Sequence, residues 1–172
     1  VAFLRTLDDS WPDWSDAALL DSSGTWLAPR LSGVRKLEEL ARVDLGGALL
    51  DTLPWELRAQ LDQLAPTHVA LPTGNRAAID YSDPAAPSVS VRLQELFGLA
   101  ETPRVGGGRV QLTLQLLSPA RRPVQVTRDL AGFWRGSYFA VRKDLRGRYP
   151  RHYCPDDPLQ AEPTARARPR GT

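Results

Sequence analysis

The sequence predicts an α+β fold: a small helical bundle, then a five-stranded antiparallel sheet or small OB-like barrel, then an amphipathic helix and a mobile tail. Three changes of pattern predict it. Apolar residues recur at helical spacing up to Pro66, alternate with polar residues beyond it, and return to helical spacing over 128–146. We therefore expect a helical segment over 1–66, a β domain with its C-terminal helix over 67–150, and an irregular Pro- and Arg-rich tail over 151–172. With 42% apolar and 24% charged residues, the composition is that of a folded domain.

Four short helices are expected in the first segment. Ser15 or Asp13 can cap the first by accepting a hydrogen bond from a backbone N–H group. Pro54 stands in the first turn of the last helix, and Pro66 ends it. The tryptophans of this segment are interpreted as core residues rather than a ligand platform: Trp11, Trp14, Trp26 and Trp55.

Five strands are expected next, with a short helix between the third and the fourth. Residues 110–116 show the clearest alternation of apolar and polar side chains. Shorter alternating stretches lie at 69–71, 79–81, 89–93 and 124–126, and residues 93–97 have helical spacing. This order is that of the OB-fold, a partly open five-stranded barrel that often binds oligonucleotides. A plain antiparallel sheet with one packed helix has the same order, so both alternatives remain open.

The last helix is expected over residues 128–146, with Gly147 ending it. A core-facing stripe is formed by Leu130, Phe133, Trp134, Tyr138, Val141 and Leu145. At about 100° per residue, a second set falls within an arc of roughly 60° beside that stripe: Arg128, Arg135, Phe139, Arg142 and Arg146. From about residue 160 the apolar pattern ends, and we expect a mobile tail.

Charge is distributed unevenly along the chain. Residues 1–70 hold six basic and eleven acidic residues, a net charge of −5, whereas residues 71–172 hold sixteen and nine, a net charge of +7. This asymmetry favours a polyanionic partner for the second half. The candidate nucleic-acid-binding residues are Arg121, Arg122, Arg128, Arg135, Phe139, Arg142, Lys143, Arg146, Arg148 and Arg151. Three alternatives remain: a genomic bias toward arginine, pairing of these residues with the acidic first third, or a simply solvated helix face.

No catalytic or metal-binding residue is predicted. His152 and Cys154 lie close together but in a Pro-rich segment, and they are too few to supply the four ligands of a structural zinc site. The three glycines at 106–108 are not followed by Lys-Ser or Lys-Thr, so they do not form a phosphate-binding P-loop. No stretch of about 18 apolar residues indicates a membrane span. The lone cysteine favours a reducing compartment, and the lack of methionine leads us to expect a piece of a longer protein.

Several long strings resemble the C-terminal region of the bacterial HrpB family of ATP-dependent, DEAH-type RNA helicases. These are QELFG at 94–98, LSPARRPVQVTRDLAGFW at 117–134 and GRYPRH at 147–152, with WLAP at 26–29 and LAPT at 64–67 upstream. The resemblance covers about residues 10–160. The family tends to have Trp where this chain has Cys154, which concerns only the packing of the segment that follows the last helix.

The resemblance implies a non-motor piece of a cytoplasmic helicase that unwinds or remodels RNA through two RecA-like motor domains. Neither G-x-x-x-x-G-K-[ST] nor Asp-Glu-Ala-His occurs here. ATP and Mg²⁺ are therefore expected to act in the parent's motor domains, and no cofactor is expected in this piece. The implied partners are RNA and those motor domains, with no membrane. The alternative is a scaffold or protein-interaction module that packs on the motor without touching RNA.

Overall fold

The computed structural model describes residues 1–167, apart from the side chain of Leu37. The chain divides into two compact units, Val1–Ala65 and Pro66–Thr172. The division lies within one residue of the point where the apolar spacing changes from helical to alternating. No helix within residues 1–167 combines the length and the apolar character that crossing a membrane requires.

The first unit is a chain of short helices. They are α1 (Ala2–Arg5), α2 (Asp16–Asp21), α3 (Ser23–Trp26), the 3-10 helix η1 (Ala28–Leu31), α4 (Leu37–Leu40), α5 (Leu45–Leu50) and α6 (Trp55–Leu64). Ser15 caps α2 as expected, with its hydroxyl oxygen accepting from the N–H of Ala18 at 3.4 Å. Asp44 caps α5 in the same way through the N–H of Gly47 at 2.8 Å.

The tryptophans of the first unit do not all lie in its core. Trp11 is buried with Phe3 and Leu4, and Trp14 and Trp26 are half-buried. Trp55 is 75% exposed, so its assignment to the core is wrong. It opens α6, a helix with no fully buried residue.

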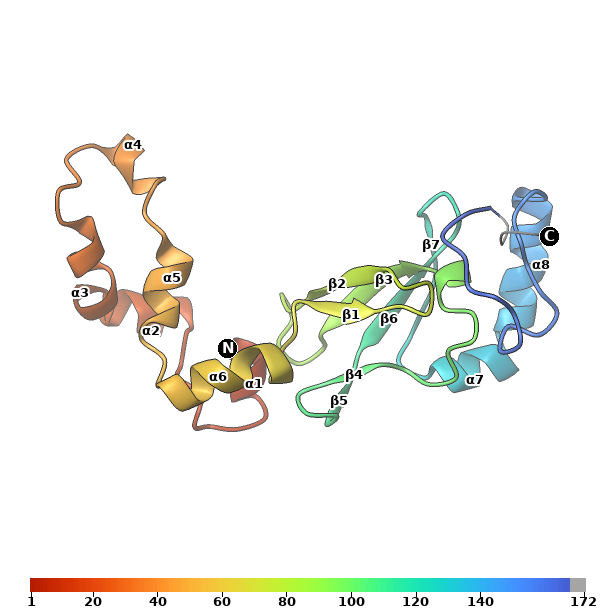
Figure 1. Cartoon of the computed structure of the whole chain (residues 1–172), viewed down its shortest axis with the longest axis horizontal. Helices are drawn as coiled ribbons and strands as arrows, with labels where there is room; N and C mark the ends of the chain where they lie inside the picture. Colours follow the sequence, from red (N-terminus) through yellow and green to blue (C-terminus); the bar gives the residue numbers. More distant parts are fainter. Residues whose placement is uncertain (168–172) are drawn as a thin grey trace. The chain divides into compact units, whose positions relative to one another are not determined.

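The second unit is built on a mixed five-stranded sheet. Its strands are β1 (His68–Ala70), β2 (Arg76–Asp80), β3 (Ser88–Arg92), β6 (Thr113–Leu117) and β7 (Pro123–Thr127), hydrogen-bonded in the order β1-β2-β3-β6-β7. A separate two-stranded hairpin joins β4 (Arg104–Val105) to β5 (Val110–Gln111). Figure 1 shows β3 and β6 in the middle of the sheet, between β2 and β7.

The sheet differs from the antiparallel one that the sequence predicts. β3 and β6 are parallel, with Val89 opposite Leu114, whereas the other three pairs are antiparallel. A parallel neighbour requires a crossover, and here it is formed by the 3-10 helix η2 (Leu93–Glu95) and the β4–β5 hairpin. Because the strand order is linear from β1 to β7, it does not support the OB-like barrel.

One face of the sheet is buried and the other is open. Ile79, Val89, Val91, Leu114 and Leu116 alternate along three strands and form the core side. On the opposite side Ser90 and Gln115 are exposed and joined by a hydrogen bond of 2.9 Å between their side chains. The exposed side of this sheet thus carries polar side chains on β3 and β6, with the exposed Val126 of β7 opposite Gln115.

The expected helix over 128–146 is two helices, α7 (Leu130–Arg135) and α8 (Tyr138–Arg148). Gly136 separates them with a backbone conformation, φ −120° and ψ −94°, outside the helical region. A Cβ at this position would lie 3.3 Å from the carbonyl oxygen of Gly132, which is a tight contact. The aromatic part of the core-facing stripe nevertheless holds. Trp134 and Tyr138 pack against Phe97 at ring-centroid distances of 6.2 and 6.5 Å, and Phe133 packs against Trp134 and Tyr138 at 5.0 and 6.0 Å.

The segment after α8, residues 151–167 (the exit segment), is irregular but docked. The N–H of Gly98 donates to the carbonyl oxygen of Pro158 at 2.9 Å, and the N–H of Thr164 donates to that of Gln94 at 3.0 Å. Ala161 and Thr164 are buried. The expectation of a mobile tail from residue 160 is therefore wrong up to residue 167, because backbone hydrogen bonds and small buried side chains hold the segment without apolar periodicity. The rest of that tail, 168–172, lies outside the described residues.

Candidate nucleic-acid interface

The structure distributes the ten predicted contact residues over four places. Arg121 and Arg122 lie in the β6–β7 turn, Arg128 and Arg135 flank or end α7, and Arg151 lies in the exit segment. The other five lie on α8: Phe139, Arg142, Lys143, Arg146 and Arg148. The helix is interrupted at Gly136, so residues 128–146 do not share one helix axis. The predicted arrangement of the arginines and Phe139 within a single arc of roughly 60° therefore does not form.

Three of the predicted arginines are held by partners within the unit. Arg142 donates from Nε to the carbonyl oxygen of Cys154 at 3.2 Å and is paired with Asp156. Arg148 pairs with Asp144 one turn earlier on α8, at 3.0 Å. Arg142 thus joins α8 to the exit segment, whereas the Arg148–Asp144 pair is exposed and lies within one helix.

Arg128 is the third. It donates from Nε to the hydroxyl of Thr113 at 3.0 Å and from Nη2 to the carbonyl oxygen of Ala85 at 3.3 Å. Arg128 thus lies near the points where β3 and β6 begin, and not on a helix face.

A smaller basic face remains on α8. Phe139, Lys143 and Arg146 follow one another at i, i+4 and i+7, so they share one side of the helix. All three are exposed, as is Arg135 at the end of α7. Phe139 is 53% exposed and, with Arg135, lines a hollow of about 360 Å³ that Trp134, Pro158 and Leu159 also line. We call Arg135, Phe139, Lys143 and Arg146 the helical basic face.

A second cationic feature lies on the open side of the sheet. An open groove of about 460 Å³ is lined by Leu71, Asn75, Arg76, Ala77, Ser90, Val91, Arg92, Glu95, Leu117 and Arg121. We call it the sheet groove. Of its three arginines, only Arg121 is among the residues that the sequence predicts. The signal that could have revealed the others is positional: Arg76 begins one strand and Arg92 ends the next strand of an antiparallel pair.

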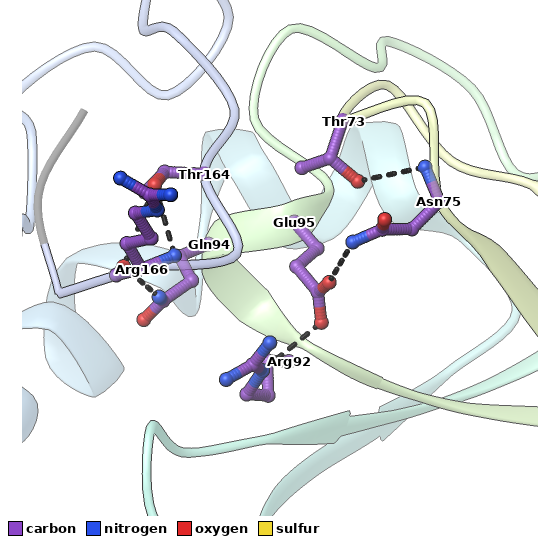
Figure 2. Close-up of polar contacts among 7 residues, drawn as sticks. All are labelled: Thr73, Asn75, Arg92, Gln94, Glu95, Thr164 and Arg166. Atoms are coloured by element: carbon purple, nitrogen blue, oxygen red, sulfur yellow. Dashed lines mark hydrogen bonds and ion pairs between the residues drawn. The ribbon is translucent and has the colours of Figure 1, made fainter. Parts of the chain in front are cut away.

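Glu95 organises the polar side chains of the sheet groove. It is only 8% exposed, and its two carboxylate oxygens accept from Arg92 Nε at 3.0 Å and from Asn75 Nδ2 at 3.2 Å. Figure 2 shows Glu95 between these two side chains, while Gln94 points the other way, toward Arg166 of the exit segment. The short helix η2 therefore supports the groove on one side and the exit segment on the other.

His152 and Cys154 both lie in the exit segment. Burial raises the pKa of the Cys154 thiol, so the thiol is protonated at neutral pH, whereas a nucleophilic cysteine needs a lowered pKa. The ring of His152 packs edge-on against Tyr149, with centroids 5.8 Å apart. His152 and Cys154 line a hollow of about 650 Å³ along the exit segment.

Comparison with known proteins agrees with the strings singled out in the sequence. A protein-family model described as ATP-dependent helicase C-terminal, HrpB_C, matches residues 26–158. The chain belongs to this HrpB_C family. The resemblance inferred from the sequence is thereby confirmed.

Relatives of this HrpB_C region come from a much longer protein. The chain is 46% identical over 158 residues to the ATP-dependent RNA helicase HrpB of Escherichia coli strain K12, an alignment that spans 92% of this chain and 20% of that protein. The crystal structure of the E. coli DExH-box NTPase HrpB matches with a TM-score of 0.86 and 44% identity, covering 96% of this chain and 21% of that one. A crystal structure of the E. coli DEAH/RHA helicase HrpB matches with a TM-score of 0.67 and 42% identity, covering 87% and 20%. The chain thus spans about a fifth of the length of these relatives.

Proposed function

We propose that this chain is the non-motor C-terminal domain of a cytoplasmic ATP-dependent RNA helicase, and that it contacts RNA while packing on the motor domains of the same parent chain. Membership of the HrpB_C family and the helicase activity that the E. coli relative is named for support this context. In this proposal ATP and Mg²⁺ act in the motor domains, and the present chain contributes binding rather than chemistry.

The observation that carries the RNA contact is the helical basic face. Lys143 and Arg146 are exposed one turn apart, so both cations can reach phosphates of one strand. Phe139 stands on the same side with half of its surface exposed, which is the arrangement that stacks an unpaired base. Phosphate contacts of this kind release counterions and weaken steeply with added salt.

Binding of a labelled single-stranded RNA to the 172-residue chain tests the proposal. Fluorescence anisotropy at increasing KCl should show an affinity that falls steeply with salt. Arg135→Glu, Lys143→Glu and Arg146→Glu together should abolish binding while the melting temperature is kept. Arg142 is left intact because its contacts with Cys154 and Asp156 stabilise the fold.

A matched control exists in the first unit. Arg35, Lys36 and Arg42 are exposed and have the same composition of two arginines and one lysine. Their combined reversal to Glu makes the same change in net charge and should retain binding. The absence of RNA binding by the unaltered chain at low salt would rule the RNA contact out.

A scaffold role is the second candidate, and it has an observation of its own. Phe139 and Leu159 are exposed apolar side chains beside one hollow, a type of surface that packs against protein. In a full-length helicase, the same triple reversal would then impair the coupling of ATP hydrolysis to RNA while RNA affinity stays unchanged. That outcome would favour the scaffold over the RNA contact.

A further inference from the structure

Two arginines from neighbouring antiparallel strands line the sheet groove. β2 and β3 are antiparallel, with Ile79 opposite Val89 and Asp80 opposite Ser88. Arg76 and Arg92 lie three residues beyond the Ile79–Val89 pair on their strands, and both line the sheet groove. Like charges brought close together on neighbouring strands destabilise the strand pair. A feature that costs stability at this position calls for an explanation.

A second local cost lies in the turn that closes the same groove. Arg121 has φ +60°, and it is the one residue other than glycine with a positive φ in the described part of the chain. Side chains with a Cβ disfavour this region, in which glycine is the usual residue. The turn is well defined, because the N–H of Arg121 donates to the carbonyl oxygen of Ser118 at 2.8 Å and the N–H of Ser118 donates to that of Arg122 at 2.8 Å.

These two unfavourable features supply the three cations of one groove. Arg76, Arg92 and Arg121 come from β2, β3 and the β6–β7 turn, and all line the same 460 Å³. The one carboxylate among the lining residues, Glu95, leaves a net charge of +2. Sites where a sequence departs from local structural preference without structural gain are those where function is expected.

Glu95 acts here as a positioning residue. Its carboxylate accepts a hydrogen bond from Nε of Arg92, which fixes the orientation of that guanidinium group. The two Nη groups of Arg92 are not used in this hydrogen bond. The Asn75 amide is held by the other carboxylate oxygen. The groove is therefore organised in advance, so that little side-chain entropy is lost on binding an anion.

We propose that the sheet groove binds the phosphodiester backbone of single-stranded RNA, with Arg76, Arg92 and Arg121 as its phosphate ligands. No aromatic side chain is among the residues lining the groove, so base stacking is not available and recognition is independent of sequence. The open face includes Ser90 and Gln115, whose hydroxyl and amide suit the sugar–phosphate backbone of a strand. The identity of the ligand as RNA rests on the proposed function; the site is separate from the helical basic face.

Two substitutions separate this role from a structural one. Arg121→Gly removes the cation and places at φ +60° the residue that tolerates it best. Arg76→Gln removes one of the three positive charges of the groove. Both variants should melt at or above the temperature of the unaltered chain, yet each should bind a labelled single-stranded RNA about tenfold more weakly. The slope of log affinity against log salt should become shallower by about 0.7 for each arginine–phosphate pair that a substitution removes.

Arg104→Gln is the matched control, because Arg104 is an exposed arginine of the same unit outside the groove. It removes the same single charge and should change affinity by less than about threefold. Inorganic phosphate, added at constant ionic strength, should leave RNA binding unchanged. Displacement of the RNA by phosphate would show that the groove takes a free anion and would overturn the assignment to a strand.

The two proposals fail in different ways. Absence of RNA binding by the unaltered chain at low salt would overturn both. A different result would separate them. Suppose that the unaltered chain binds RNA, that Arg76→Gln and Arg121→Gly bind it equally tightly, and that the triple reversal on the helical basic face abolishes binding. The sheet-groove proposal would then be wrong, and the proposed function would stand.

Discussion

Arg142 on α8 is paired with Asp156 of the exit segment, and the two side chains are very unequally exposed. Only 15% of the Arg142 side chain is accessible, against 91% for Asp156. Arg142 also donates to the carbonyl oxygen of Cys154, so it joins the last helix to the backbone that follows it. A residue that the sequence assigns to RNA binding therefore has a structural role.

The two members of this pair should contribute differently to stability. Arg142→Ala removes the hydrogen bond to Cys154 and the packing of a mostly buried stem, and should lower the free energy of unfolding by about 1–3 kcal/mol. Asp156→Ala removes only a solvent-screened partner and should cost less than about 1 kcal/mol. Urea titration of both variants measures the difference. Equal losses would contradict the structural role of Arg142.

The carboxylate of Glu95 should matter more than that of an exposed neighbour. Glu95→Ala leaves Arg92 Nε and Asn75 Nδ2 without their partner in a half-buried setting, and should lower the free energy of unfolding by about 1–3 kcal/mol. Glu101→Ala, at an exposed position of the same unit, should change it by less than about 0.5 kcal/mol. Thermal melts of the two variants provide the comparison, and similar shifts would refute it.

Docking of the exit segment should depend on Gln94. Its amide donates to the carbonyl oxygen of Arg166, and its own backbone carbonyl oxygen accepts from Thr164, as Figure 2 shows in part. Gln94→Ala should therefore speed amide hydrogen exchange in the exit segment, including Thr164, while exchange in β3 and β6 is unchanged. Unaltered exchange at Thr164 would mean that the side chain does not hold the segment.

Stability should fall in alkaline solution. Burial raises the pKa of Tyr81 from 10.0 to about 12, and burial also raises the pKa of Tyr138, whose hydroxyl donates to the carbonyl oxygen of Pro155 at 2.8 Å. Above about pH 10 the unfolded chain loses these protons first, so the folded state binds more protons and the free energy of unfolding decreases as the pH rises. Below about pH 10 both phenols are neutral in both states, and their contribution is fully present.

Phenylalanine variants test this pH dependence. Tyr138→Phe and Tyr81→Phe should each flatten the decline of the unfolding free energy between about pH 10 and pH 12. Tyr138→Phe should also lower stability at about pH 8, because the carbonyl oxygen of Pro155 loses its buried donor. A decline that is as steep in both variants as in the unaltered chain would assign it to other groups.

Much of the second unit is predictable from the order of the residues. Alternation locates the five strands of the sheet, although the strand expected over 110–116 is divided between β5 of the hairpin and β6 of the sheet. The change of spacing near Pro66 lies at the division between the units. The helical stripe of Phe133, Trp134 and Tyr138 points to the buried aromatic cluster. These features are local, because the repeat of the backbone determines which side chains share a face.

The sequence by itself determined the strands, the position of the core and the family of this chain. The tertiary structure alone decided that β3 and β6 run parallel, that the last helix breaks at Gly136, and that the exit segment docks on Gln94. It also paired Arg142 with Asp156 of the exit segment and brought Arg76 and Arg92 to one groove. The physical reason is that periodicity reports the direction of a side chain relative to its own backbone, whereas the partner it meets depends on how distant segments pack.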